Sequence, residues 1–198
     1  MDVQTILDQY PLPHIRLFDR QVFIRYLQTI YGVVISSEPL LERAIERTIE
    51  RDLHDYYKEH LIEEHDHAKW FREDLLVLNA FPLPVHWGAA LFVGPQYYLL
   101  ENGPSSTLLG YIAVLECRPM DLNTVAALED HYGREPLRAI RYHSEHDPEH
   151  KIDVLKMIDS LWEPQWELVM KNVALVASSL PYLFEGIDSR AKVANAFS

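Results

Sequence analysis

The chain has 198 residues, enough for one domain with a sizeable apolar core. Its formal charge of −12 argues against nucleic acid and against anionic membranes as partners, and the single cysteine, Cys117, excludes an internal disulfide and fits a reducing compartment. Residues 1–10 have no signal-peptide pattern, and no apolar run approaches the roughly 20 residues of a membrane span. We therefore expect a cytoplasmic protein.

Helical periodicity dominates the chain, and no strand-like alternation exceeds four residues. Two prolines mark residues 1–16 as an arm leading into the fold, and paired prolines near residue 82 should end the longest helix. The pattern predicts an all-α fold, a bundle of about seven helices in a single domain over residues 1–198. The expected helices are 19–35, 37–49, 53–78, 107–118, 121–131, one beginning at Pro136, and 164–182, with a shorter segment over 95–101 between the third and the fourth.

The first cluster of metal-binding residue types lies between His60 and Trp70. Residues three, four and seven apart share one face of a helix, so His60, Glu64 and His67 should line up, with Glu63 beside them. Glu64-x-x-His67 is the (i, i+3) pair that helical carboxylate-bridged dimetal sites use. His65 and Asp66 should face water. The competing interpretation is a polar helix face that happens to contain histidines.

A second cluster follows the same logic in the helix after Pro136. His143, Asp147 and His150 have i, i+4 and i+7 spacing and should share one face. Asp147-Pro148 also resembles a helix N-cap followed by proline, so Asp147 has a second interpretation as the cap of a new turn. His146 lies near this face and is the main rival ligand.

Glu116 ends an otherwise apolar helix, where a buried carboxylate would need a cation or a hydrogen-bond partner. The alternative is a solvent-facing position at the helix end. Together the three helices offer three carboxylates and three imidazoles, a ligand set typical of non-haem iron with open positions for dioxygen and substrate. The predicted metal ligands are Glu64, His67, Glu116, His143, Asp147 and His150.

These motifs resemble the haem-oxygenase-like diiron oxidases and oxygenases, including members labelled iron-containing redox enzymes. The resemblance covers roughly residues 20–185 and rests on His60 to Trp70, on Tyr97-Tyr98 with Pro104 to Glu116, and on His143-x-x-x-Asp147-x-x-His150. It implies a seven-helix haem-oxygenase-like fold and two Fe ions (Fe2+/Fe3+) with dioxygen as co-substrate. It also implies N-oxygenation, desaturation or carbon–carbon cleavage of a small amine, amino acid or fatty acid.

The chain departs from the family in one respect. Several relatives separate the first glutamate and histidine by more residues than Glu64 and His67 are separated here. His60 or Glu63 therefore remains an alternative to a named ligand.

Other functions remain open on the same fold. A thiaminase-like enzyme would use Cys117 as its nucleophile, and a haem oxygenase would need an axial histidine, for which His14 lacks the expected setting. A single-metal hydrolase and a non-catalytic helical binding protein with surface histidines are also compatible with the sequence.

The expected partner is a small-molecule substrate, with no nucleic acid and no membrane, and a homodimer is left open. Tyr97, Tyr98, Tyr111 and Trp87 are candidates to line the substrate pocket, although each is also compatible with an ordinary aromatic core. Arg134, Arg138 and Arg141 are nearby candidates for binding a substrate carboxylate.

Overall fold

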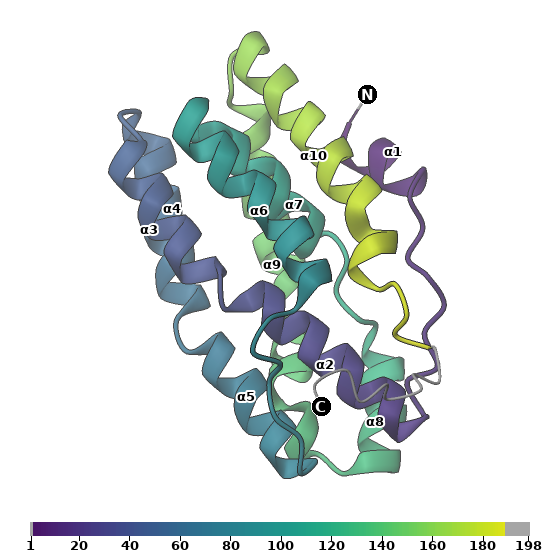
Figure 1. Ribbon diagram of the computed structural model, residues 1–198. Coiled ribbons are helices and arrows are strands. Elements are labelled where there is room, and N and C mark those ends of the chain that lie inside the picture. Colours follow the sequence, from purple (N-terminus) through teal and green to yellow (C-terminus); the bar gives the residue numbers. More distant parts are fainter. Residues whose placement is uncertain (1, 189–198) are drawn as a thin grey trace, which may run out of the picture.

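The computed structural model describes residues 2–188, and this part of the chain is an elongated bundle of helices (Figure 1). It contains ten α-helices and two short 3₁₀ helices. They are α1 Val3–Asp8, α2 Arg20–Val34, α3 Ser37–Arg47, α4 Arg51–Glu64, α5 His67–Val77, α6 Trp87–Asn102, η1 Ser105–Thr107, α7 Leu108–Glu116, α8 Leu122–Tyr132, η2 Glu135–Leu137, α9 Arg138–Asp159 and α10 Glu163–Leu183.

The all-α prediction is confirmed for the described residues, whereas the expected number of helices was too low. The arm contains a short helix, α1, whose N-terminus is capped by the Asp2 carboxylate, which accepts from the Thr5 N–H at 2.8 Å. Helix α6 begins at Trp87, eight residues before Pro95, so Pro95 lies inside the helix rather than at its start. Residues 1 and 189–198 of the predicted domain lie outside the described residues.

The largest error in the predicted elements concerns segment 53–78, which is two helices rather than one. Helix α4 ends at Glu64, His65 is extended, and Asp66 adopts a left-handed conformation with φ of 69° before α5 begins at His67. Aspartate is among the few residues with a side chain that tolerate this conformation, and helical periodicity does not reveal such a bend. Glu64 and His67 therefore do not share one helix face, but lie on either side of the bend.

The left-handed backbone at Asp66 leads to a prediction about stability. Both Asp66→Gly and Asp66→Ala lose the Asp66 carboxylate, which lies 3.8 Å from Lys69 Nζ in an exposed ion pair. Only alanine adds the steric cost of a left-handed residue, about 1 kcal/mol. We expect Asp66→Ala to be the less stable of the two by about this amount in urea denaturation. Equal stability of the two variants would contradict a left-handed residue at this position.

Two groups of buried apolar side chains form the core. The larger group joins α7 and α10 with parts of α1, α3, α4, α6 and α9, and the smaller group joins α2 and α5 with α8 and the start of α9. Helices α7 and α10 approach so closely at Gly110 that an added Cβ would lie 2.7 Å from the Val169 carbonyl oxygen. Buried Asn172 reinforces this junction, since its Nδ2 donates to Thr107 O at 2.7 Å and to Gln96 Oε1 at 2.8 Å. In the described residues, no helix combines the length and apolar character needed to span a membrane.

The Asp74 carboxylate positions the start of α9. Its Oδ2 accepts a hydrogen bond from the Ala139 N–H at 2.9 Å, and the side chain is almost fully buried. Burial raises the pKa of Asp74 to about 6, although the contacts with Ala139 and Arg138 oppose the increase. The carboxylate therefore joins α5 to α9, the helix that carries the second histidine cluster.

The raised pKa of Asp74 predicts a pH-dependent stability. The folded state holds a proton on Asp74 between the unfolded pKa near 4 and the folded pKa near 6, so stability falls as the pH rises through this window. The loss has an upper limit of about 3 kcal/mol, and Asp74→Asn should not show it because an amide does not ionise. Urea denaturation from pH 4 to pH 7 should show Asp74→Asn gaining stability relative to the unmodified chain. A difference that is constant across this range would refute the assignment.

Candidate metal centre

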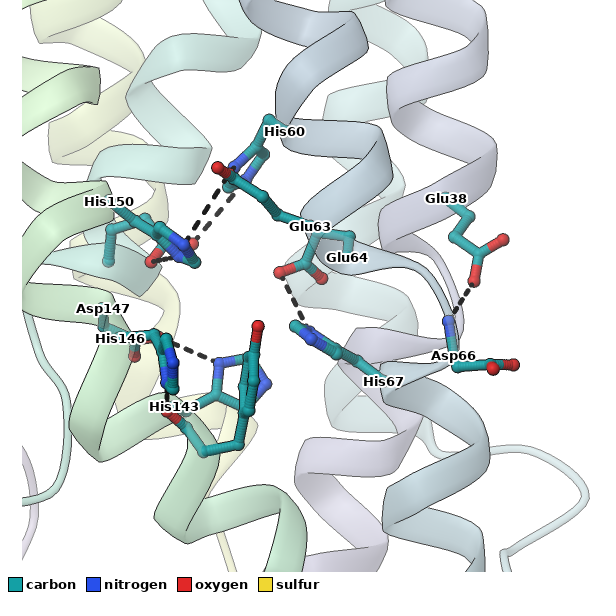
Figure 2. Close-up of polar contacts among 12 residues, drawn as sticks. Glu38, His60, Glu63, Glu64, Asp66, His67, His143, His146, Asp147 and His150 are labelled. Atoms are coloured by element: carbon teal, nitrogen blue, oxygen red, sulfur yellow. Dashed lines mark hydrogen bonds and ion pairs between the residues drawn. The ribbon is translucent and has the colours of Figure 1, made fainter.

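Four helices bring the predicted ligands together. Helix α4 contributes Glu64 at its last residue, α5 contributes His67 at its first, α7 contributes Glu116 at its last, and α9 contributes three ligands from its middle. Figure 2 shows His60, Glu64 and His67 on one side and His143, Asp147 and His150 on the other. Helix α9 runs without interruption through Pro148, so Asp147 does not cap a new helix, and the i, i+4, i+7 face forms as expected.

The first group of possible ligands is Glu64, His67 and His143, whose nearest ligand atoms all lie within 4.8 Å of one another. His67 is fully buried, and its Nδ1 lies 3.3 Å from Glu64 Oε1. The bend at Asp66 makes this contact, because it turns the first residue of α5 back towards the last residue of α4.

The second group is Glu116, Asp147 and His150, with ligand atoms at the same mutual spacing. His150 Nδ1 lies 3.5 Å from Glu116 Oε2, and Asp147 Oδ1 lies 3.0 Å from His143 Nδ1 of the first group. Glu116 and Asp147 are only 4% and 6% exposed, so the interpretation of Glu116 as a solvent-facing residue was wrong.

A third group, His60, Glu64 and Glu116, takes one carboxylate from each of the other two. Its existence means that the two groups adjoin along Glu64 and Glu116, as carboxylates shared between two ions would require. His60 is buried, and its Nε2 lies 3.7 Å from Glu116 Oε1. The structure thus places His60, which sequence reasoning kept only as an alternative, in the same cluster as the six predicted residues.

Glu63 lies outside the cluster but contacts two of its imidazoles. Its Oε2 is 3.2 Å from His60 Nδ1 and 3.7 Å from His150 Nε2 (Figure 2). The other nitrogen of each ring faces Glu116, with His60 Nε2 at 3.7 Å from Oε1 and His150 Nδ1 at 3.5 Å from Oε2. A carboxylate that accepts from one ring nitrogen leaves the lone pair of the other free to bind a metal. Sequence reasoning considered Glu63 only as a substitute ligand. Its spacing from His60 was the available signal, but the contact with His150 depends on tertiary packing.

The electrostatics of the cluster reflect three carboxylates in a buried site. Burial raises the pKa of Glu64, but contacts with His67, His143 and His60 outweigh it and lower the pKa to about 2. Contact with Glu116 raises the pKa of His150 to about 9. For Glu116, burial raises the pKa despite the opposing effects of His150 and His60. The carboxylates thus favour protonation of His150 in the chain alone, and a bound cation would replace that proton.

Several buried nitrogen and oxygen atoms of the cluster lack a hydrogen-bond partner, and their chemistry indicates whether a metal ion could bind there. Both ring nitrogens of His67, His143 Nε2, His150 Nδ1 and Glu116 Oε2 are buried and make no hydrogen bond to any described residue. Buried polar atoms without a partner are costly, and all of these are atoms that ligate metals. Mixed carboxylate and imidazole donors suit iron, manganese or zinc, so the residues present could hold a metal ion of this kind.

The other residues considered as metal ligands or nucleophiles do not join the cluster. His146 Nδ1 contacts the carbonyl oxygen of Tyr142 at 2.8 Å, so this rival ligand faces its own helix. His65 and Asp66 contact Glu38 on α3 and lie at the surface, as expected. His14 is exposed, and burial raises the pKa of the Cys117 thiol to about 11, which makes it a poor nucleophile at neutral pH.

A cavity adjoins the cluster, with a free volume of about 1150 Å³ that includes the part open to solvent. Its lining combines four ligand candidates and His60 with apolar side chains from both core groups. Tyr111 lines it, and the Tyr111 hydroxyl is buried without a hydrogen-bond partner among the described residues. Tyr97, Tyr98 and Trp87 do not line it. They lie on the outward side of α6, because the buried side carries residues such as Phe92 and Gln96.

No protein-family model matches the chain, and no curated protein matches it. The structure is similar to that of a domain of unknown function with a haem oxygenase-like fold from Shewanella denitrificans. The TM-score is 0.61 and the identity 16%, and the match covers 98% of this chain and 89% of that domain. This similarity confirms the predicted fold, and the chain is an all-α protein with the haem-oxygenase-like fold.

Proposed function

We propose that the chain is a non-haem diiron oxidase or oxygenase that uses dioxygen to oxidise a small amine, amino acid or fatty acid. The observation that carries this proposal is the pair of adjoining three-ligand groups. In these groups, His67, His143, His150 and Glu116 each present a buried ligand atom that makes no hydrogen bond to the described residues. A single-metal hydrolase would need one such group, and the second would then leave buried polar atoms unsatisfied.

The residues have distinct roles in this proposal. Glu64, His67 and His143 would hold one iron, Asp147 and His150 the other, and Glu116 lies where it can serve both, as does Glu64. When bound, the iron pair supplies the electrons that activate dioxygen. Glu63 orients His60 and His150, and the apolar cavity walls exclude water and hold the substrate beside the cluster.

The test begins with Fe(II) added to the full-length chain without oxygen, followed by measurement of the iron bound per chain. Air is then admitted, and oxygen consumption and visible absorption are followed. We expect about two iron ions per chain and rapid oxygen uptake. The proposal would be contradicted if the chain bound no metal, or if the double variant Glu116→Ala/His150→Ala bound as much metal as the unmodified chain. Zinc binding without oxygen consumption in the iron-treated chain would favour the hydrolase.

A thiaminase-like enzyme and a helical binding protein are less well supported by the arrangement of side chains. A thiaminase-like reaction requires a reactive thiol, and the raised pKa of Cys117 opposes this. A binding protein with surface histidines would not bury His60, His67 and their carboxylate neighbours together.

A further inference from the structure

The outward side of helix α6 carries a stripe of large apolar side chains that the described part of the chain leaves exposed. Trp87, Leu91 and Tyr98 follow one another after four and seven residues, so they share one helix face, with Gly94 at its middle. Their exposed fractions are 77%, 65% and 68%, and an added Cβ at Gly94 would meet no atom within 4 Å. A helix that is apolar on both sides is normally buried on both, whereas α6 is buried on one.

Helix α10 packs beside α6 and widens the stripe (Figure 1). The carbonyl oxygen of Tyr182 would lie 3.1 Å from a Cβ at Gly88, the residue after Trp87. Leu175 lies one helical turn after Asn172, whose amide is hydrogen-bonded to α6. Leu175 and Tyr182 are both exposed and are seven residues apart, so they border the stripe on α10. We call this surface the α6 face, and it consists of Trp87, Leu91, Tyr98, Leu175 and Tyr182.

The α6 face is uncharged in a strongly acidic protein. Residues 75–100 and 172–184 contain no aspartate, glutamate, lysine or arginine, although these four residue types make up 24% of the chain. Glu101, which follows the first of these ranges, is paired with Arg43 Nε at 2.6 Å and with Arg47 Nη1 at 3.8 Å. Two chains that each carry a formal charge of −12 therefore repel each other least where this face meets its own copy.

The size of the α6 face fits a dimer. With about 200 Å² for a fully exposed aromatic side chain and less for leucine, its five side chains expose roughly 600 Å². A stable protein interface of standard size buries about 800 Å² on each partner. The apolar side chains of the face would therefore supply most of the area that stable self-association requires.

We infer that two copies of the chain associate through the α6 face, with their α6 helices antiparallel across a two-fold axis at Gly94. A two-fold interface is self-complementary, so residues before Gly94 in one copy meet residues after Gly94 in the other. Leu91 and Tyr98 lie three residues before and four residues after Gly94, so each packs against the other in the second copy. Trp87 and Glu101 both lie seven residues from Gly94. The Trp87 ring therefore covers the paired Glu101 of the second copy, beside arginines that suit an aromatic ring.

Sedimentation equilibrium of the full-length chain without metal measures the association directly. We expect a species of twice the 23.1 kDa chain mass, with a Kd of about 1 µM or tighter. Leu91→Glu should raise this Kd at least about 100-fold, because each copy would bury an unpaired carboxylate in an apolar interface. Leu122→Glu, at a leucine of α8 that is 55% exposed, makes the same change outside the face and should leave the Kd unchanged.

The double variant Leu91→Glu/Tyr98→Lys tests the antiparallel pairing. Each glutamate would meet a lysine of the second copy, whereas within one helix the two positions lie about 10 Å apart, too far to pair. We expect the double variant to dimerise at least about 10-fold more tightly than Leu91→Glu alone. A double variant no tighter than Leu91→Glu would refute the antiparallel pairing.

Two results would overturn the dimer itself. The first is an unmodified chain that stays monomeric at about 100 µM, and adsorption of that monomer to phosphatidylcholine vesicles would assign the face to a membrane. The second is Leu91→Glu with the same Kd as the Leu122→Glu control, which would place the dimer contact elsewhere. Neither iron nor substrate is present in these measurements, so their outcome is separate from that of the iron-uptake test.

Discussion

Glu116→Gln should lower the affinity for iron by at least about 100-fold, because this carboxylate belongs to two of the three ligand groups. Loss of an outer partner of a metal ligand already costs about 10–100-fold, so the loss of a ligand that serves both groups should cost more. Glutamine keeps the volume of the side chain but carries no charge. We expect bound iron to fall from about two per chain to at most one, as measured by anaerobic titration.

The control for this variant is Glu149→Gln, which removes an exposed carboxylate from helix α9, two residues from Asp147. It makes the same chemical change and the same change in net charge, so long-range electrostatics should affect both variants alike. We expect its iron binding to match that of the unmodified chain. If Glu116→Gln binds iron as this control does, Glu116 is not a ligand, and a shared diiron site cannot be correct.

Gly110→Ala should destabilise the fold by about 2–3 kcal/mol, at the upper end of the effects of overpacking. The added Cβ would lie 2.7 Å from the Val169 carbonyl oxygen and 2.9 Å from the Val173 nitrogen, both in the backbone of α10. Backbone atoms cannot rotate away as a flexible side chain can, so α7 and α10 must separate. Urea denaturation measures the loss directly, and thermal denaturation should show a midpoint lower by roughly 5–10 °C.

Gly94→Ala is the matched control, since a Cβ at this position in α6 meets no atom within 4 Å. The gain in helix propensity and the restriction that Pro95 places on the preceding residue oppose each other, so we expect a change within about 1 kcal/mol of zero. A Gly110→Ala variant as stable as this control would show that α7 and α10 do not approach closely at Gly110. Because α7 carries Glu116, Gly110→Ala should also weaken iron binding.

Much of the candidate site could be predicted from sequence because it depends on helical spacing. The i, i+4, i+7 arrangement of His143, Asp147 and His150 places three side chains on one face of any regular helix, and α9 is regular there. Burial of Glu116 followed from the apolar residues that precede it. The predicted metal-ligand roles of these residues remain predictions until iron binding is measured.

The features that sequence could not predict all depend on contacts between distant segments or on a local bend. The contact of Glu64 with His67 results from a left-handed residue, Asp66, and not from the helical spacing on which the expectation was based. The two contacts of Glu63, with His60 and with His150, exist together only because the fold brings side chains of α4 and α9 to the same cluster. Of the tyrosines predicted to line the substrate pocket, Tyr111 lines the cavity, whereas Tyr97 and Tyr98 do not. Helical periodicity alone does not determine which side of α6 faces α7.

The sequence by itself determined the all-α character, the set of residues able to bind metal, and the acidic, single-cysteine composition. These properties depend on local periodicity and residue chemistry, which each short segment carries alone. Only the tertiary structure decided that His60 joins the cluster and that Glu64 and Glu116 adjoin. Such relations require the packing of helices far apart in the chain, which depends on the fit of the whole core.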